Sequence, residues 1–405
     1  MADNNENKVL NVPHLRFPEF SGEWKKHSLG EIGETIIGLT YKPSDVVDNN
    51  GIIVFRSSNI KNGMIDYSDL VRVNKYIKDK IITKENDILV CARNGSQRLI
   101  GKNAIIKQED ANNTFGAFMM VYRANDNPFI LPLLSTNKYF SQVGENLGAR
   151  INQITTSDFN GFEFYFPENH AERTKIAELF RLLDERIATQ NKIIEKLQSL
   201  IKGLNDNIHK GIKGETVCFS DLGEAYSGLS GKGGDDFGYG EPFITYMNVY
   251  QNTYISEKDY ELVQIAPNEK QNSVQYGDAL FTLSSETPEE VGIGAVYLGN
   301  TQKLYLNSFC FGIHFYDERV LPQYLAHFIS SSSFRRAIYP LAQGSTRFNL
   351  QKNDFMKMKF LLPSLEKQGH IANTLDALHC RLANEKSLTE QYILLKKYLL
   401  SLMFI

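Results

Sequence analysis

The sequence predicts an α/β (α+β) protein in which two globular domains are joined by two long helices that form an antiparallel coiled coil. A seven-residue apolar repeat occurs twice, strand-like runs precede each copy, and a longer series of matching residues surrounds both copies. An antiparallel helix pair would relate the halves by an internal pseudo-two-fold axis. The expected segments are an N-terminal arm (1–20), a first globular domain (21–167), a central long helix (168–212), a second globular domain (213–363) and a C-terminal long helix (364–405).

The first apolar repeat begins at Ile176 and ends at Ile208, in steps that alternate between four and three residues. A helix of this length, about 50 Å at 1.5 Å per residue, is too long to cover an ordinary domain, so a second helix is the expected partner. Only Gln190 is polar among the positions reached. These positions are Ile176, Phe180, Leu183, Ile187, Gln190, Ile194, Leu197, Ile201, Leu204 and Ile208.

The second repeat, Ile371–Met403, lies 195 residues further along the chain. Both copies place their first polar residue at the same step, Gln190 and Glu385. Antiparallel pairing would bring these two near one another, and a polar pair in an apolar seam often fixes the register of the helices. A tolerated polar interruption is the simpler alternative. Beyond Glu385 the apolar face is expected to widen through Leu388, Ile393 and Leu395.

The globular domains repeat as well, because the spacing between matched residues varies only from 189 to 197. The run Asp87–Val90 matches Asp278–Phe281, for example, and Pro167 and Pro363 each close the last strand before a long helix. The repeat therefore contains one mixed domain and one helix, written twice. The strands expected in the first copy are Ile52–Phe55, Ile88–Val90, Phe118–Tyr122 and Phe162–Phe166.

The composition is that of an ordinary soluble protein, with 42% hydrophobic and 22% charged residues and no apolar run of the ~18 residues that span a bilayer. Four cysteines without CxxC spacing favour reduced thiols and a cytoplasmic location, with no membrane partner. Residues 21–166 hold 17 Lys and Arg against 16 Asp and Glu, whereas residues 215–363 hold 11 against 17. Bulk charge therefore does not indicate a nucleic-acid partner.

Motifs of catalysis are missing from the sequence. We find no GxxxxGK[ST] phosphate loop, no HExxH metal site and no GxSxG nucleophile elbow. The sequence therefore favours a non-catalytic recognition protein that binds neither a metal nor a cofactor itself. One alternative is an adaptor without DNA, carrying two ligand-binding heads on a coiled-coil strut, which the acidic second domain favours slightly.

The motif series resembles the specificity subunit of type I restriction–modification enzymes. The resemblance is carried by Pro13–Phe20, Gly277–Phe281 and Gly344–Asn349, and by the Ile-Ala pairs near the start of each long helix. It implies two target-recognition domains that each bind half of a split double-stranded DNA sequence. A strut of about 50 Å suits half-sites roughly one turn, ~34 Å, apart.

The same resemblance implies partner subunits that perform the chemistry. Two modification (methyltransferase) subunits would dock on the helices and methylate adenine with S-adenosylmethionine. Restriction subunits, which are ATP-dependent translocases and nucleases, would use ATP and magnesium. The assembled complex would then be a type I site-specific endonuclease and adenine-specific DNA methyltransferase, and this chain would contribute recognition alone.

The DNA-contacting residues are expected in loops that differ between the copies while their flanking strands agree. Arg pairs with guanine, Asn or Gln with adenine, and Glu or Asp with cytosine in the major groove. Solvated surface loops without a ligand are the alternative. The first copy offers Arg56, Ser57, Asn59, Arg93, Asn94, Gln97 and Arg98. The second offers Tyr246, Asn248, Ser284, Ser285, Glu286 and Thr287. Arg150 and Arg347 occur in both copies, which favours a phosphate contact or a structural role.

Overall fold

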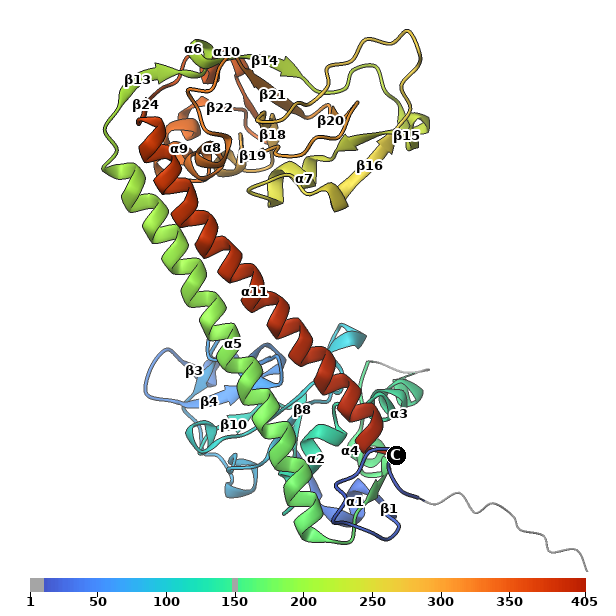
Figure 1. The fold of residues 1–405 in the computed structure, drawn as a ribbon. Coiled ribbons are helices and arrows are strands. Elements are labelled where there is room, and N and C mark those ends of the chain that lie inside the picture. Colours follow the sequence, from blue (N-terminus) through green and yellow to red (C-terminus); the bar gives the residue numbers. More distant parts are fainter. Residues whose placement is uncertain (1–10, 148–151) are drawn as a thin grey trace, which may run out of the picture. The chain divides into compact units, whose positions relative to one another are not determined.

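The computed structural model describes residues 11–147 and 152–405. The chain divides into two compact units, the first made of Met1–Asn191 with Ser387–Ile405 and the second of Lys192–Lys386. Two long helices, α5 (His170–Lys210) and α11 (Leu365–Met403), each contribute residues to both units (Figure 1). Within the described ranges, no helix has the length and apolar character that crossing a membrane requires.

The first unit is built on an antiparallel sheet with the strand order β2-β11-β8-β9. A second sheet, β10-β4-β7-β3, lies beside it, and the small pairs β1-β12 and β5-β6 complete the strands. The strands are β1 (Lys25–Ser28), β2 (Glu34–Ile37), β3 (Val46–Val47), β4 (Ile52–Phe55), β5 (Ile60–Lys61), β6 (Met64–Ile65), β7 (Arg72–Val73), β8 (Ile88–Cys91), β9 (Asn103–Ile105), β10 (Thr114–Phe115), β11 (Met119–Arg123) and β12 (Glu163–Phe166). The short helices are α1 (Leu29–Ile32), α2 (Asn127–Leu133), α3 (Asn137–Leu147) and α4 (Thr156–Asn160).

The second unit repeats this plan with the main sheet β14-β21-β17-β19. The sheets β16-β15-β20, β18-β23-β22 and β13-β24 surround it. The strands are β13 (Glu215–Cys218), β14 (Gly223–Ser227), β15 (Phe237–Ile244), β16 (Tyr260–Val263), β17 (Ala279–Thr282), β18 (Ser284–Ser285), β19 (Gly294–Val296), β20 (Tyr305–Leu306), β21 (Cys310–Phe315), β22 (Ala342–Gln343), β23 (Phe348–Leu350) and β24 (Lys359–Leu362). The short helices are α6 (Phe219–Leu222), α7 (Tyr246–Gln251), α8 (Pro322–Ile329), α9 (Ser332–Ile338) and α10 (Lys352–Met356).

The register of the main sheets shows that the duplication in the sequence is a duplication of structure. Val90 lies opposite Met120 in the first unit, and Phe281 lies opposite Phe311 in the second, 191 residues later in each strand. The repeated glycines have a steric cause at Gly38, where an added Cβ would lie 2.2 Å from the Gly116 carbonyl oxygen. At the matching Gly228 the Cβ would lie 2.1 Å from the Asn307 carbonyl oxygen.

Within the first unit, the N-terminal half of α5 packs against the C-terminal half of α11 in an antiparallel direction. Lys396 Nζ lies 2.5 Å from Asp184 Oδ1, and Arg186 Nε donates to the Tyr392 hydroxyl over 3.2 Å. As the α5 number rises, the α11 number of its partner falls. In the second unit, Leu204 and Ile208 of α5 pack on a core that contains Ile371 and Leu375 of α11. The predicted coiled coil is confirmed.

The seam of each long helix follows the apolar repeat, since all ten predicted positions are buried or half-buried in both copies. The expected widening of the apolar face in α11 is wrong in detail. Ile393 and Leu395 are 39% and 42% exposed, whereas the polar residues Thr389 and Lys396 lie on the inner side. Lys396 forms an ion pair with Asp184 of α5, which is compatible with its place on the inner side, and the seam keeps its seven-residue course.

Candidate nucleic-acid interface

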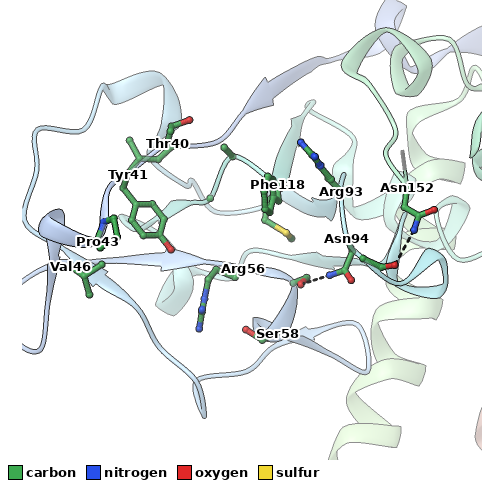
Figure 2. A pocket seen from close by; sticks show the side chains of 16 residues that line it. Thr40, Tyr41, Pro43, Val46, Arg56, Ser58, Arg93, Asn94, Phe118 and Asn152 are labelled. Atoms are coloured by element: carbon green, nitrogen blue, oxygen red, sulfur yellow. Dashed lines mark hydrogen bonds between the residues drawn. The ribbon is translucent and has the colours of Figure 1, made fainter. Parts of the chain in front are cut away.

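A groove of about 1140 Å³ opens in the first unit where the ends of several strands meet. One wall is the loop after β2, which includes Tyr41, together with Val46 at the start of β3. The other walls are the end of β4, the loop after β8 and the turn between β10 and β11 (Figure 2). The groove is lined by Leu39, Thr40, Tyr41, Pro43, Val46, Arg56, Ser57, Ser58, Arg93, Asn94, Gly95, Gly116, Ala117, Phe118, Met119 and Asn152.

Backbone hydrogen bonds hold the loop after β8 in place, and the Arg93 side chain stays exposed to solvent. The N–H groups of Ala92 and Arg93 donate to the Phe118 carbonyl at 3.0 and 2.9 Å. The Arg93 guanidinium lies over the Phe118 ring, 5.0 Å from its centroid. Arg93 is exposed and forms no ion pair with any described residue. Its charge is therefore available to a ligand in the groove.

Asn94 lines the groove, and half of its hydrogen-bonding capacity is in use. Its Nδ2 donates to Ser57 Oγ at 2.9 Å, and its Oδ1 accepts from the Ser96 N–H at 3.0 Å. A primary amide has two donor hydrogens and two acceptor lone pairs. One donor and one acceptor therefore remain, which is the pair that an adenine edge requires.

Arg56 lines the same groove but is already neutralised. Its Nη2 lies 2.8 Å from Asp69 Oδ2, and its Nε is buried without a hydrogen-bond partner. Gln97 and Arg98 lie on the short 3-10 turn Gln97–Leu99, exposed but outside the groove lining. Arg150 lies outside the described residues. The structure thus brings four of the expected residues together, Arg56, Ser57, Arg93 and Asn94.

Asn59 and Asn248 require a correction, because both amides are inside the protein. Asn59 is fully buried, and its Nδ2 donates to the carbonyls of Asp66 and Asp69 at 3.0 and 2.8 Å. Asn248 is 2% exposed, and its amide bonds both the N–H and the carbonyl of Ser256. Asn59 ends the 3-10 turn after β4, and Asn248 lies in helix α7 after β15. Both amides are used inside the protein, so neither can meet a base edge as it is placed.

The equivalent place in the second unit is a smaller groove of about 310 Å³. Ser284 and Ser285 form strand β18 and are only 9% and 8% exposed, so they support the groove more than they project into it. The Tyr246 hydroxyl donates to the Ser284 carbonyl at 2.8 Å. The groove is lined by Tyr246, Met247, Tyr250, Ser284, Ser285, Glu286, Glu290, Phe309 and Arg347.

The two carboxylates of this groove differ in availability. Glu290 accepts from the Tyr250 hydroxyl at 2.7 Å and from Ser285 Oγ at 3.1 Å, and these bonds hold the pKa of Glu290 below its usual value. Glu286 is exposed, and its carboxylate forms no hydrogen bond or ion pair with another described residue. Arg347 is exposed at the rim, and Thr287 is exposed beside the lining. Glu286 is therefore the free acceptor of the second groove.

The structure adds apolar residues that the sequence interpretation did not include. Tyr41 and Phe118 line the first groove, and Met247, Tyr250 and Phe309 line the second. Phe118 and Phe309 are 191 residues apart, the same offset that relates Asp87 to Asp278, so their equivalence was visible in the alignment of the copies. Among the described residues, no group of three His, Cys, Asp or Glu side chains could hold a metal ion.

Comparison with known proteins agrees with this arrangement. The chain is 24% identical over 387 residues to the EcoKI specificity subunit of Escherichia coli (strain K12), a match that covers 88% of this chain and 82% of that protein. It is 26% identical over 187 residues to the StySPI specificity subunit of Salmonella potsdam, covering 44% of this chain and 40% of that one.

Similarity extends to solved structures and to a family model. The crystal structure of a type I restriction–modification S subunit from M. genitalium superposes with a TM-score of 0.56 at 14% identity, covering 97% of this chain and 99% of that one. Residues 21–199 and 214–391 each match the model described as the type I restriction modification DNA specificity domain. The chain therefore belongs to the family of type I restriction modification DNA specificity domains and carries that domain twice.

Proposed function

We propose that this chain is the sequence-recognition subunit of a type I restriction–modification complex and binds a bipartite double-stranded DNA target. The observation that carries the proposal is the pair of grooves at equivalent places in the two units, with different free polar groups in each. Equivalent frames suit the same kind of ligand, and different side chains suit different sequences. The family match does not favour the alternative of an adaptor without DNA.

In the first groove, Arg93 is suited to donate to N7 and O6 of a guanine, because its guanidinium is exposed and unpaired with acid. Asn94 is suited to an adenine through its remaining donor and acceptor. Arg56 is positioned by Asp69 and orients the groove wall. Gln97 and Arg98 extend the interface beyond the lining, where a phosphate contact is within their chemistry.

In the second groove, Glu286 is suited to accept from N4 of a cytosine. Arg347 at the rim is suited to a phosphate, a role that also agrees with an arginine in the matching motif of the first copy. Tyr246 and Thr287 supply hydroxyl groups beside it. The first half-site is accordingly expected to contain guanine and adenine contacts, and the second a cytosine contact.

The chemistry of modification and restriction belongs to partner subunits in this proposal. Two methyltransferase subunits would supply adenine methylation with S-adenosylmethionine, and restriction subunits would use ATP and magnesium. An exposed apolar stripe on α11 supports a docking role, because Leu394 and Tyr398 are 64% and 61% exposed and lie one helical turn apart. Partner subunits would also supply cationic surface that this chain, with a net charge of −3, lacks.

A map of methylated adenines in cells that carry this chain and its methyltransferase partner tests the function. The expected map shows one split motif with an adenine methylated on each strand. In vitro, the complex should bind a duplex with that motif less tightly as salt rises, because bound phosphates release counterions. An expressed complex that methylates no split motif, or whose binding is indifferent to salt and sequence, contradicts the proposal.

A further inference from the structure

Two phenylalanines occupy the same place in the two units and are exposed in both. Phe118, in the turn between β10 and β11, is 59% exposed, and Phe309, just before β21, is 56% exposed. Each lines the groove of its own unit. A ring that stays more than half exposed gains only part of the free energy of apolar burial. Its recurrence at equivalent positions, each inside a groove, favours a ligand that covers it.

Backbone hydrogen bonds, and not packing in a hydrophobic core, fix the position of each phenylalanine. The carbonyl of Phe118 accepts from Ala92 and Arg93, and the carbonyl of Phe309 accepts from Leu283 at 2.8 Å. The hydrophobic clusters formed by the described residues include neither ring. The turn is thus anchored beside the recognition loop, while the side chain stays available.

The surroundings of the rings favour contact through the ring edge over insertion between base pairs. One face of Phe118 is covered by the Arg93 guanidinium, so the ring cannot stack on a base at both faces (Figure 2). Phe309 shares its groove with Met247, which is 48% exposed and also apolar. The apolar group that a major groove offers to such an edge is the 5-methyl of thymine.

We propose that Phe118 and Phe309 each contact the methyl group of one thymine, Phe118 in the first half-site and Phe309 in the second. In the first groove the adjacent Arg93 contacts the neighbouring guanine, so ring and guanidinium act as one recognition unit. This inference rests on the proposed function and adds the base type that each groove selects through an apolar contact.

The test uses the complex with its methyltransferase partner and duplexes of the mapped motif in which each thymine is replaced in turn by deoxyuridine. Deoxyuridine lacks only the methyl group, and the burial of one such group corresponds to about fourfold in affinity. We expect one position in each half-site to show this loss. Phe118→Ala should abolish the sensitivity in the first half-site alone, and Phe309→Ala in the second alone. Phe140→Ala, which changes another exposed phenylalanine of the first unit, is the matched control.

Each outcome decides the assignment. A half-site without an A·T pair, or one in which no thymine shows the loss, overturns the role of its phenylalanine. So does an alanine variant that keeps the full methyl sensitivity. A split motif that is methylated but insensitive to deoxyuridine refutes this inference and leaves the proposed function intact, whereas the absence of any split motif refutes the function itself. Thermal unfolding of each variant close to that of the wild type establishes that the fold is retained.

Discussion

Glu172, in the first turn of α5, is a carboxylate enclosed by the first unit. Its side chain is 1% exposed and accepts two hydrogen bonds of 2.7 Å from Arg16 of the N-terminal segment. The Trp24 indole donates to the same carboxylate at 3.3 Å. Arg16 also donates to the carbonyls of Ser21 and Gly22, so one arginine joins the segment before β1 to the long helix. Removing one member of such a pair leaves an uncompensated buried charge.

We therefore expect Arg16→Ala to lower the free energy of unfolding of the first unit by about 3 kcal/mol. Urea denaturation monitored by the fluorescence of Trp24, the single tryptophan of the chain, measures this change. The matched control is Glu178→Ala on the same helix, which removes an exposed ion pair with Arg181 and should cost far less, because solvent screens exposed charges. Equal effects of the two substitutions would show that the buried pair stabilises the first unit no more than an exposed pair does.

Buried histidines connect the second unit to its long helices. His209 packs against Tyr324 and Phe328 and donates through Nδ1 to the Asn205 carbonyl at 2.9 Å. His327 Nε2 lies 2.7 Å from Asp376 Oδ1 of α11. Burial lowers the pKa of both His209 and His327 below the usual value. Because the unfolded chain then binds protons more readily, the neutral histidines stabilise the fold fully above about pH 6.5 and less as the pH falls.

Acidification from pH 7.5 to 5.5 should accordingly destabilise the wild type more than it destabilises His209→Gln. The variant lacks one group that must stay neutral, so its free energy of unfolding depends less steeply on pH. Urea denaturation of the second unit at both pH values provides the comparison, with His370→Gln, an exposed site on α11, as control. A variant with the wild-type slope would assign the pH dependence to other groups.

At the scale of elements, the sequence was most informative where a pattern is long and periodic. The two helices and their seam follow from the apolar repeat, and strands β4, β8 and β12 lie within a residue of the expected runs. The pairing of α5 with α11 was predictable because a helix of about 50 Å, the length of the apolar repeat, cannot be buried by a small domain. The spacing of apolar residues along one helix can be read without knowing which distant segments pack on it, so it can be recognised from the sequence alone.

The grooves could be predicted only in part, because their composition depends on which chain segments meet. The loop after β8 was found through its contrast with the second copy, and Arg93, Asn94 and Glu286 do line grooves. Asn59 was included among the expected DNA-contacting residues for its residue type. Its amide instead donates to two backbone carbonyls, whose position beside it could not be predicted without the fold. Phe118 was assigned to a strand, and its exposure follows from the turn before β11.

The polar residue in the apolar seam of each long helix leads to a prediction about the register of the helix pair. Gln190 and Glu385 are 1% and 7% exposed in a seam that is otherwise mostly apolar. A buried polar residue in a coiled-coil seam selects one register at a cost in stability. We expect Gln190→Leu with Glu385→Leu to raise the melting temperature and to relax the gap between half-sites, so that the methylation map contains motifs with more than one spacing. A single, unchanged spacing would mean that these residues are tolerated interruptions.

At the scale of the whole molecule, each of the two compact units holds a groove of its own, and in the proposed function each groove binds one half-site. Each groove is lined by residues of its own unit alone. Substitutions at sites without shared partners act additively to within about 0.5 kcal/mol. The specificity of one half-site should therefore change while that of the other is kept.

Arg93→Ala with Arg98→Ala tests this independence, with Glu286→Gln as the counterpart in the second unit. The arginine variant should lose about 1–3 kcal/mol of discrimination at one base pair of the first half-site, and Glu286→Gln should relax one base pair of the second. Combining the substitutions should relax both positions by the sum of the separate effects. The methylation map of each variant, taken at equal expression, measures occupancy and motif together. If the arginine variant changes neither the occupancy nor the motif, the loop after β8 is not part of the interface. If one variant changes both half-sites at once, the two grooves are coupled.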